Sequence, residues 1–238
     1  MQPVTSFRVC AYNVLAQNLA TSRYFPSAKQ ALKIAKRYPL LRQKFQSINA
    51  DIICVSEAFG DVVDMLRSLN YEVRYIQRHN KTYGNAIAWR GEVFEVQREA
   101  TATFNDCADA VPSFPIRIQG SGVSILRDDF LTENIAMFMQ LRFKQHADCS
   151  VCVCSTHLYW DPSKDPVKIA QAQMLHLCAA DFAALCGGSP LIIGADLNSL
   201  PESEVYARYA IPRCSVVKFC TGTRACLLLD GALLAALR

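Results

Sequence analysis

Short apolar runs that end at polar residues constrain the fold of this chain more than any other feature of the sequence. Four runs, over residues 7–14, 51–56, 150–157 and 191–195, have the length and composition of buried strands. They end at or beside Asn13, Glu57, His157 and Asp196. Because layered α/β proteins often place reactive groups where strand ends converge, the pattern predicts one polar rim.

Helical patterns separate these runs. Apolar residues at helical spacing predict helices over residues 38–48, 61–69 and 165–186, the last ended by Gly187 and Gly188. A short helix is expected to open at Pro201. Further strands are expected over residues 71–77, 85–89, 93–99, 123–126 and 135–143. This mixed order predicts one α/β domain with sheets inside and helices outside.

The composition agrees with one globular domain. The 238 residues are 51% hydrophobic and 19% charged, which excludes disorder and fibrous repeats. Without a run of about 18 apolar residues, no membrane-spanning helix is expected. The net charge of +4 permits a phosphate-bearing partner but is too small to indicate nucleic acid by itself. The first residues lack the pattern of a signal or transit peptide, so a cytoplasmic location is expected.

Eleven cysteines are present, and most lie in apolar runs. Cys149, Cys152 and Cys154 are spaced like part of a metal knuckle, but no second paired cluster accompanies them. We expect reduced packing cysteines rather than a zinc site.

The polar rim has the chemistry of a divalent-cation site. Glu57 and Asp196 supply anionic oxygens, and Asn13 and Asn198 supply neutral ones, a set that suits Mg²⁺ or Mn²⁺. His157 is able to donate a hydrogen bond or charge to a phosphoryl oxygen. Taken singly, each residue also has a purely structural interpretation, as a turn cap, a solvated loop residue or a buried imidazole.

Four local motifs carry a family resemblance. The most specific is His-Leu-Tyr-Trp-Asp-Pro at 157–162, followed by Asp-Pro-Val-Lys at 165–168. Asp-Leu-Asn-Ser-Leu-Pro at 196–201 is nearly as specific, and Tyr-Asn-Val-Leu-Ala-Gln at 12–17 and Ser-Glu at 56–57 add to it. Over about residues 7–210 the sequence resembles the endonuclease/exonuclease/phosphatase superfamily. Its deadenylase branch, which includes carbon catabolite repressor-type deadenylases, Angel proteins, nocturnin and the 2′,5′-phosphodiesterase, is the most similar.

The resemblance implies a fold and a metal site. The fold would be a four-layer α/β sandwich of the DNase I type, two mixed β-sheets flanked by helices, with its last strands missing or divergent. Glu57 would be the principal Mg²⁺ ligand, and Asn13 would position the metal or the phosphate. Asp196 would orient or deprotonate the attacking water, and Asn198 would hold metal or phosphate beside it.

The resemblance also implies substrate contacts. His157 would contact the phosphate and stabilise charge in the transition state. Pro162 matches a position that packs near the 3′-terminal base, and Asn134 matches a further motif near the site.

One part of the family pattern is missing. The pattern closes on a Ser-Asp-His motif, but no histidine follows Asp196 here, and Asp230 does not match. We therefore expect an endonuclease/exonuclease/phosphatase domain over residues 1–210, incomplete at its C-terminus, and a divergent tail over residues 211–238. The tail is either an aberrant end or the mark of a degenerate relative. Without closing strands, one sheet is expected to keep an unpaired edge.

Three functions remain open at this point. The leading hypothesis is a Mg²⁺-dependent 3′-5′ exoribonuclease that removes poly(A), with RNA as its partner. The second is a pseudoenzyme that binds RNA or a protein, because the closing histidine is absent. The third is hydrolysis of a smaller adenine-containing substrate, either a 2′,5′-oligoadenylate or the 2′-phosphate of a dinucleotide, as in nocturnin-like enzymes. A membrane-acting relative is not favoured, since no basic amphipathic anchor is present.

Two further groups of residues have competing interpretations. The densest basic stretch either contacts an RNA backbone or forms a solvated helix face; it comprises Arg23, Lys29, Lys33, Lys36 and Arg37. Tyr159 and Trp160 are expected to pack at the core or rim rather than to stack on a base.

Overall fold

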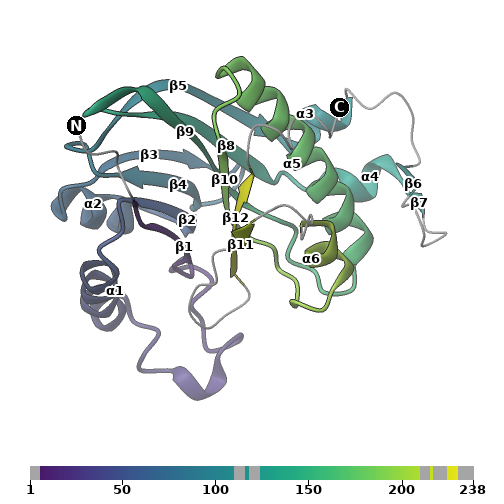
Figure 1. Cartoon of the computed structure of the whole chain (residues 1–238). Helices are drawn as coiled ribbons and strands as arrows, with labels where there is room; N and C mark the ends of the chain where they lie inside the picture. The colour runs from purple at the N-terminus through teal and green to yellow at the C-terminus, as the bar shows by residue number, and fades with distance from the viewer. Residues whose placement is uncertain (1–5, 110–115, 118–123, 210–214, 217–223, 230–238) are drawn as a thin grey trace.

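Two β-sheets packed face to face form the centre of the molecule, and helices cover their outer faces (Figure 1). The computed structural model describes residues 6–109, 116–117, 124–209, 215–216 and 224–229. The predicted four-layer α/β sandwich with two mixed sheets is confirmed.

The first sheet has four strands in the order β1-β2-β4-β3. They are β1 (Val9–Asn13), β2 (Ile52–Ala58), β3 (Glu72–Gln77) and β4 (Gly84–Trp89). A short helix η1 (Pro26–Ala28) and helix α1 (Ile34–Ile48) join β1 to β2, and α2 (Gly60–Ser68) follows β2. Phe45 of α1 and Met65 and Leu66 of α2 are fully buried among the residues of this layer.

Helix α1 begins four residues before the predicted start at residue 38. The prediction followed the apolar residues at helical spacing, which begin only after residue 38. In the structure Pro39 lies inside the helix, in its second turn, where its ring removes a single backbone hydrogen bond.

The second sheet has six strands in the order β11-β12-β10-β9-β8-β5. They are β5 (Phe94–Thr103), β8 (Ile135–Phe143), β9 (His146–His157), β10 (Leu191–Asp196), β11 (Ser215–Val216) and β12 (Arg224–Leu229). Helix α5 (Asp165–Leu185) lies along its outer face and buries Val167, Leu175 and Phe182. The remaining elements are α3 (Phe104–Asp109), β6 (Ile116–Arg117), β7 (Ser124–Ile125), α4 (Arg127–Phe130) and α6 (Glu204–Tyr209).

The edge of β10 is paired, which corrects the expectation of an unpaired edge. Strand β12 lies antiparallel to β10 over its whole length, from Leu191 opposite Leu229 to Asp196 opposite Arg224. The sequence expectation relied on the absence of family motifs, whereas pairing requires only a backbone in register. The domain boundary at residue 210 stays a prediction.

The two sheets approach closely beside the rim. A Cβ added at Gly194 of β10 would lie 2.5 Å from Cβ of Cys54 on β2, so only glycine fits there. Nearby, the Ser56 hydroxyl donates a hydrogen bond of 3.2 Å to the carbonyl of Thr156. This close approach holds the strand ends of the two sheets near each other.

The cysteine prediction is confirmed for two of its three named residues. Cys152 and Cys154 are fully buried, and burial raises the pKa of both thiols. Cys149 is exposed, because it precedes the buried part of β9. Within the described ranges no helix is long and apolar enough to cross a membrane.

His176 on α5 gives a test of the packing of this helix. Burial lowers the pKa of His176 to about 4, whereas an unfolded histidine titrates near 6.5. The contribution of neutral His176 to the free energy of unfolding should therefore be fully present above about pH 6.5. The free energy of unfolding should fall by about 2–3 kcal/mol as the pH falls from there to 4. Urea unfolding across this range checks it: His176→Leu should flatten the profile, and His79→Leu, at an exposed site, should not. Equal profiles for His176→Leu and the unchanged protein would contradict the assignment.

Candidate active site

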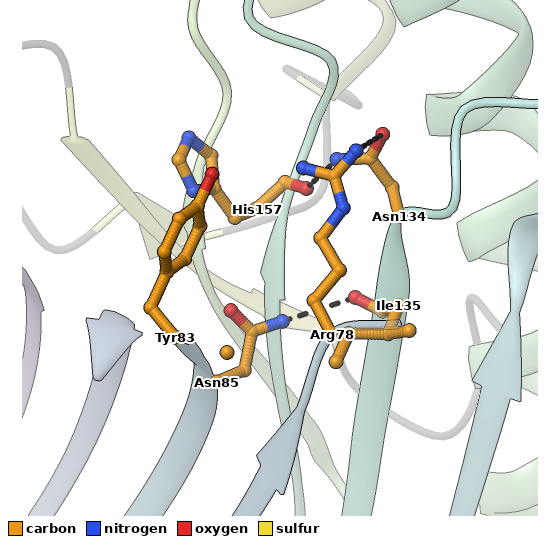
Figure 2. A pocket seen from close by; sticks show the side chains of 7 residues that line it. Arg78, Tyr83, Asn85, Asn134, Ile135 and His157 are labelled. Atoms are coloured by element: carbon orange, nitrogen blue, oxygen red, sulfur yellow. Dashed lines mark hydrogen bonds between the residues drawn. The ribbon is translucent and has the colours of Figure 1, made fainter. Parts of the chain in front are cut away.

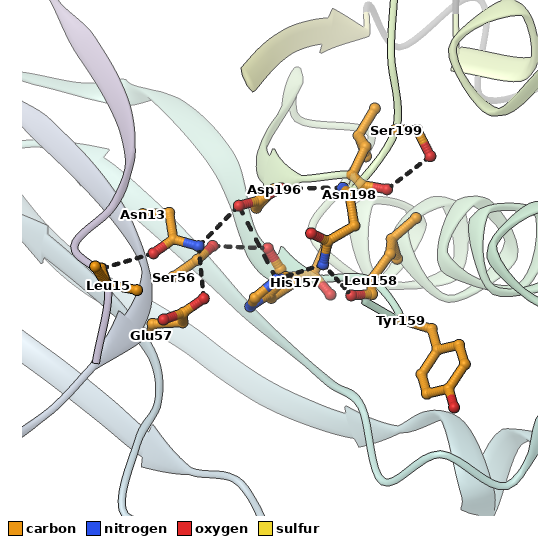
Figure 3. A network of polar contacts seen from close by, with 12 residues as sticks. Asn13, Leu15, Ser56, Glu57, His157, Leu158, Tyr159, Asp196, Asn198 and Ser199 are labelled. Atoms are coloured by element: carbon orange, nitrogen blue, oxygen red, sulfur yellow. Dashed lines mark hydrogen bonds and ion pairs between the residues drawn. The ribbon is translucent and has the colours of Figure 1, made fainter. Parts of the chain in front are cut away.

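Two pairs of parallel strands bring the polar rim together. In the first sheet, β1 and β2 run parallel with Asn13 opposite Ser56, so Asn13 and Glu57 lie at the same edge. In the second sheet, β9 and β10 run parallel with Asp196 opposite His157. Because the sheets pack face to face, the two edges meet, as Figure 3 shows. The structure thus brings together Asn13, Glu57, His157 and Asp196, the four strand-end residues that the sequence predicted at one rim.

Asn13 lies between the two carboxylates. Its Nδ2 donates hydrogen bonds of 2.8 Å to both Glu57 Oε1 and Asp196 Oδ2. Its Oδ1 accepts a hydrogen bond of 2.8 Å from the backbone N–H of Leu15, which fixes the amide orientation. Glu57 and Asp196 are both only 7% exposed. Two buried carboxylates that share one donor repel each other, and a bound cation would relieve this repulsion.

The backbone around these side chains adopts uncommon conformations. Leu15, Glu57 and Asn198 all have positive φ, at 57°, 57° and 47°. Non-glycine residues rarely adopt this region, and such strain is concentrated at functional sites. At Glu57 it coincides with a register shift between Ser56 and Ala58, a bulge that re-aims the side chain. The backbone N–H of Ala16 then holds Glu57 Oε2 at 2.8 Å.

Asn198 joins Asp196 to His157. Its backbone N–H donates to Asp196 Oδ1 at 3.0 Å, and its Nδ2 donates to the Leu158 carbonyl at 2.9 Å. Nδ2 also lies 2.6 Å from His157 Nε2. Because an amide NH₂ group can only donate, the neutral His157 ring in this arrangement accepts at Nε2 and carries its proton on Nδ1. Asp196 Oδ2 lies 4.0 Å from the same Nε2, close enough to pair with a protonated ring.

Asn134 lies behind His157. It is 1% exposed, and its Nδ2 donates to the backbone carbonyl of His157 at 2.6 Å. Its Oδ1 faces Gln171 Nε2 at 3.3 Å and Arg78 Nη2 at 3.5 Å. The contacts of Asn134 therefore fix the end of β9, while its predicted role in substrate binding stays a prediction.

Lys168 and Gln171 on α5 were not assigned from the sequence. Lys168 is 1% exposed, and its Nζ lies 2.6 Å from Asp165 Oδ1 and 3.0 Å from the Asn198 carbonyl. Gln171 Oε1 accepts from the Tyr159 N–H at 2.8 Å, and its Nε2 donates to Thr132 Oγ1 at 2.6 Å. One helix face thus holds the loops that follow β9 and β10 and the loop before β8. The sequence feature that could have indicated their role is the presence of a lysine and a glutamine within an apolar helical run.

Arg37 is also part of the site's support. Its guanidinium donates to the Val14 and Leu15 carbonyls and, at 2.9 Å, to Gln17 Oε1. Burial lowers the pKa of Arg37, and the negative charge of Glu57 opposes this shift. For Arg37 the interpretation as a solvated helix face is wrong, because its side chain is turned toward these backbone carbonyls, while contact with an RNA backbone stays a prediction.

A small hollow lies beside His157 (Figure 2). Arg78, Tyr83, Asn85 and Asn134 are among the residues that line it. Arg78 is anchored there, donating to the Thr132 carbonyl and, at 2.9 Å, to the Glu133 carbonyl. Burial raises the pKa of Tyr83, and the nearby Arg78 opposes the shift, so the phenol stays protonated at neutral pH.

Pro162 and Trp160 lie on the outside. Pro162 is exposed in the turn between β9 and α5, and its predicted place near a 3′-terminal base stays a prediction. Tyr159 packs against the core under α5, as expected. Trp160 is 64% exposed and its ring lies 6.1 Å from that of Tyr159, so it packs at the rim rather than in the core.

The donor set fits Mg²⁺ or Mn²⁺. Mg²⁺ is typically held by one or two carboxylates, with water and substrate oxygens completing its shell. Glu57 and Asp196 supply two carboxylates next to two amides and an imidazole. Among the residues that the structure describes, no three histidine, cysteine or acidic side chains are grouped as a metal site, so amide, water and substrate oxygens would have to complete the shell of a bound ion.

The fold and the rim define a DNase I-like layered α/β protein. A family model described as "Endonuclease/Exonuclease/phosphatase family" matches residues 10–230. The chain belongs to this family.

Relatives agree with the resemblance seen in the motifs. The chain is 29% identical over 170 residues to RNA exonuclease NGL2 of Saccharomyces cerevisiae, covering 68% of this chain and 32% of the relative. It is 27% identical over 230 residues to carbon catabolite repressor protein 4 homolog 4 of Arabidopsis thaliana, covering 84% and 55%. The crystal structure of ANGEL2, a 2′,3′-cyclic phosphatase, in complex with adenosine-2′,3′-vanadate aligns with a TM-score of 0.67 and 25% identity. This alignment covers 84% of this chain and 56% of ANGEL2, so the chain spans between a third and just over half of these proteins.

Proposed function

We propose that this chain hydrolyses phosphodiester bonds of RNA as a Mg²⁺-dependent 3′-5′ exoribonuclease that acts on poly(A). The observation that carries the proposal is the pair of buried carboxylates bridged by Asn13, with Asn198 and His157 beside them. The similarity to a named RNA exonuclease and to a carbon catabolite repressor homolog supports RNA as the substrate.

The side chains of the rim have distinct tasks in this reaction. Glu57 and Asp196 would hold Mg²⁺, which when bound neutralises charge on the phosphate and favours ionisation of the attacking water. Asp196 orients this water and takes its proton as the bond to phosphorus forms and the bond to the 3′ oxygen breaks. Asn13 holds the two carboxylates, and Asn198 holds Asp196 and His157, in position around the metal or the phosphate. His157 contacts the phosphate and stabilises the charge that develops in the transition state.

A second candidate substrate is a smaller adenylate. The similarity to the 2′,3′-cyclic phosphatase ANGEL2 favours a 2′,3′-cyclic end, and a 2′,5′-oligoadenylate or a dinucleotide 2′-phosphate would use the same rim. All of these place a phosphate ester of adenosine against the same carboxylates.

Metal removal tests the proposal directly. The chain is incubated with 5′-labelled RNA that ends in oligo(A), with Mg²⁺, with chelator, and with Mg²⁺ or Mn²⁺ restored. We expect stepwise 3′ shortening that falls at least about 10³-fold without metal and returns with either ion. An RNA with a 2′,3′-cyclic phosphate end and a 2′,5′-oligoadenylate are run in parallel. RNA that stays bound but intact in every lane would overturn hydrolysis and leave a binding protein.

A further inference from the structure

The positive charge of this chain is concentrated at its start. Residues 1–50 contain eight lysines and arginines and no acidic residue, whereas the rest of the chain carries a net charge of −4. An asymmetry of this kind indicates a surface for a polyanion, even where the total charge is small.

Part of this segment projects from the catalytic rim. Residues 14–33 follow β1 directly and, with η1, extend away from the sheets as the purple loop of Figure 1 before entering α1. Arg23, Lys29 and Lys33 in this loop and Lys36 at the start of α1 are all exposed. We call these four residues the basic surface. Lys29 and Lys33 line an open hollow together with Gln17.

The basic surface is connected to the site by the loop after β1. Gln17 accepts a hydrogen bond of 2.9 Å from Arg37, and its Nε2 donates to the Leu32 carbonyl at 3.0 Å. One residue earlier, the Ala16 N–H holds the Glu57 carboxylate. A nucleic-acid strand whose end lies at the rim can therefore continue past the hollow lined by Gln17, Lys29 and Lys33.

The charges of the basic surface are available to a ligand. None of its four residues has an ion-pair partner in the part of the chain that the structure describes. Two aromatic residues lie among them, Tyr24 at 61% and Phe25 at 39% exposure, and Arg23 lies over the Tyr24 ring at 5.9 Å. Cations interleaved with exposed aromatic rings suit a single strand, whose backbone meets the charges while its bases stack.

We propose that the basic surface binds the phosphate backbone of single-stranded RNA upstream of the bond placed at the rim. The proposal rests on the proposed function and deepens it, because such a surface contributes only to a polynucleotide. A cyclic nucleotide end or a dinucleotide would fill the rim and leave the basic surface without a ligand.

The test measures binding without hydrolysis. Fluorescence anisotropy compares oligo(A) of about 20 nucleotides with oligo(A) of about three, in chelator, with salt varied from about 0.05 to 0.3 M. The variant Lys29→Glu/Lys33→Glu is matched by Arg98→Glu/Lys144→Glu, which makes the same change in net charge at exposed positions of β5 and of the turn after β8. Circular dichroism confirms that both variants fold.

The expected result is specific to length and to position. The Lys29→Glu/Lys33→Glu variant should bind the longer RNA at least about tenfold more weakly and should bind the trinucleotide with unchanged affinity. For the longer RNA, the slope of log affinity against log salt should become shallower by about 1.4. The matched variant should stay within about threefold of the unchanged chain. Equal losses in both variants, or no loss in either, would overturn the proposal. The proposal would also be overturned if Lys29 and Lys33 were needed for binding to vesicles of phosphatidylcholine and phosphatidylserine but not for binding to RNA.

Failure here is distinguishable from failure of the proposed function. If RNA binds through Lys29 and Lys33 but is never shortened with Mg²⁺, the basic surface is supported as an RNA site and the exoribonuclease proposal is overturned. If RNA is shortened and the Lys29→Glu/Lys33→Glu variant binds it with unchanged affinity, the exoribonuclease proposal is supported and the basic-surface proposal is overturned.

Discussion

Replacing Glu57 by glutamine should lower kcat/KM for RNA hydrolysis by about 10³–10⁴-fold. The exchange removes one of the two carboxylates that face Asn13 and leaves the shape of the side chain unchanged. The site then loses the charge that would hold the metal, while the bulge at β2 continues to aim the side chain at the rim. Rates at several Mg²⁺ concentrations check this, since a lost ligand is only partly compensated by more metal.

The same variant should leave the fold intact. Glutamine loses one of the two hydrogen bonds that Glu57 accepts from Asn13 and Ala16, but it also relieves repulsion from Asp196. These effects oppose each other, so the free energy of unfolding should change by less than about 1 kcal/mol. The matched control is Glu202→Gln, at an exposed position shortly after Asn198, which should keep full activity. A Glu57→Gln variant with activity within about threefold of the unchanged chain would refute the assignment.

Replacing Lys168 by methionine should lower kcat by about 10–100-fold with little change in KM. Lys168 touches no substrate position; its ammonium holds the carbonyl of Asn198, and Asn198 in turn holds Asp196 and His157. Methionine fills the space but leaves this carbonyl without its donor. The turn should then shift, at a cost of about 1–3 kcal/mol in the free energy of unfolding.

The variant Asp165→Asn distinguishes a positioning role of Lys168 from a role in stability alone. It removes the charge that Lys168 faces at 2.6 Å, but it leaves the ammonium in place to hold Asn198. We expect a loss of about 1–2 kcal/mol in the free energy of unfolding and a loss of kcat below about threefold. Urea unfolding and steady-state kinetics on both variants give the comparison. A purely structural lysine would show kcat losses that follow stability in both variants.

The residues of the rim were predictable because they stand at the ends of apolar runs. An apolar run that stops at Asn13 or Asp196 marks a buried strand and its edge, and parallel pairing then brings neighbouring ends together. The local motifs at 56–57 and 196–201 added the chemistry. Strand and helix positions followed from the same periodicity. Errors arose at α1, whose expected start at residue 38 was four residues late, and in the divergent tail, which concealed β12.

The support of the rim was decided by tertiary structure. In the sequence, Arg37 suggested either an RNA contact or a solvated helix face, and Lys168 was only part of a local motif. In the structure Arg37 holds the carbonyls of Val14 and Leu15, and Lys168 holds that of Asn198. The sequence determined which side chains end the strands, because a continuous apolar run marks a strand buried on both faces and its last residue can be located along the chain. Only the tertiary structure decided which charges turn inward, because their partners are backbone carbonyls brought close by packing, and a carbonyl carries no signature in the sequence.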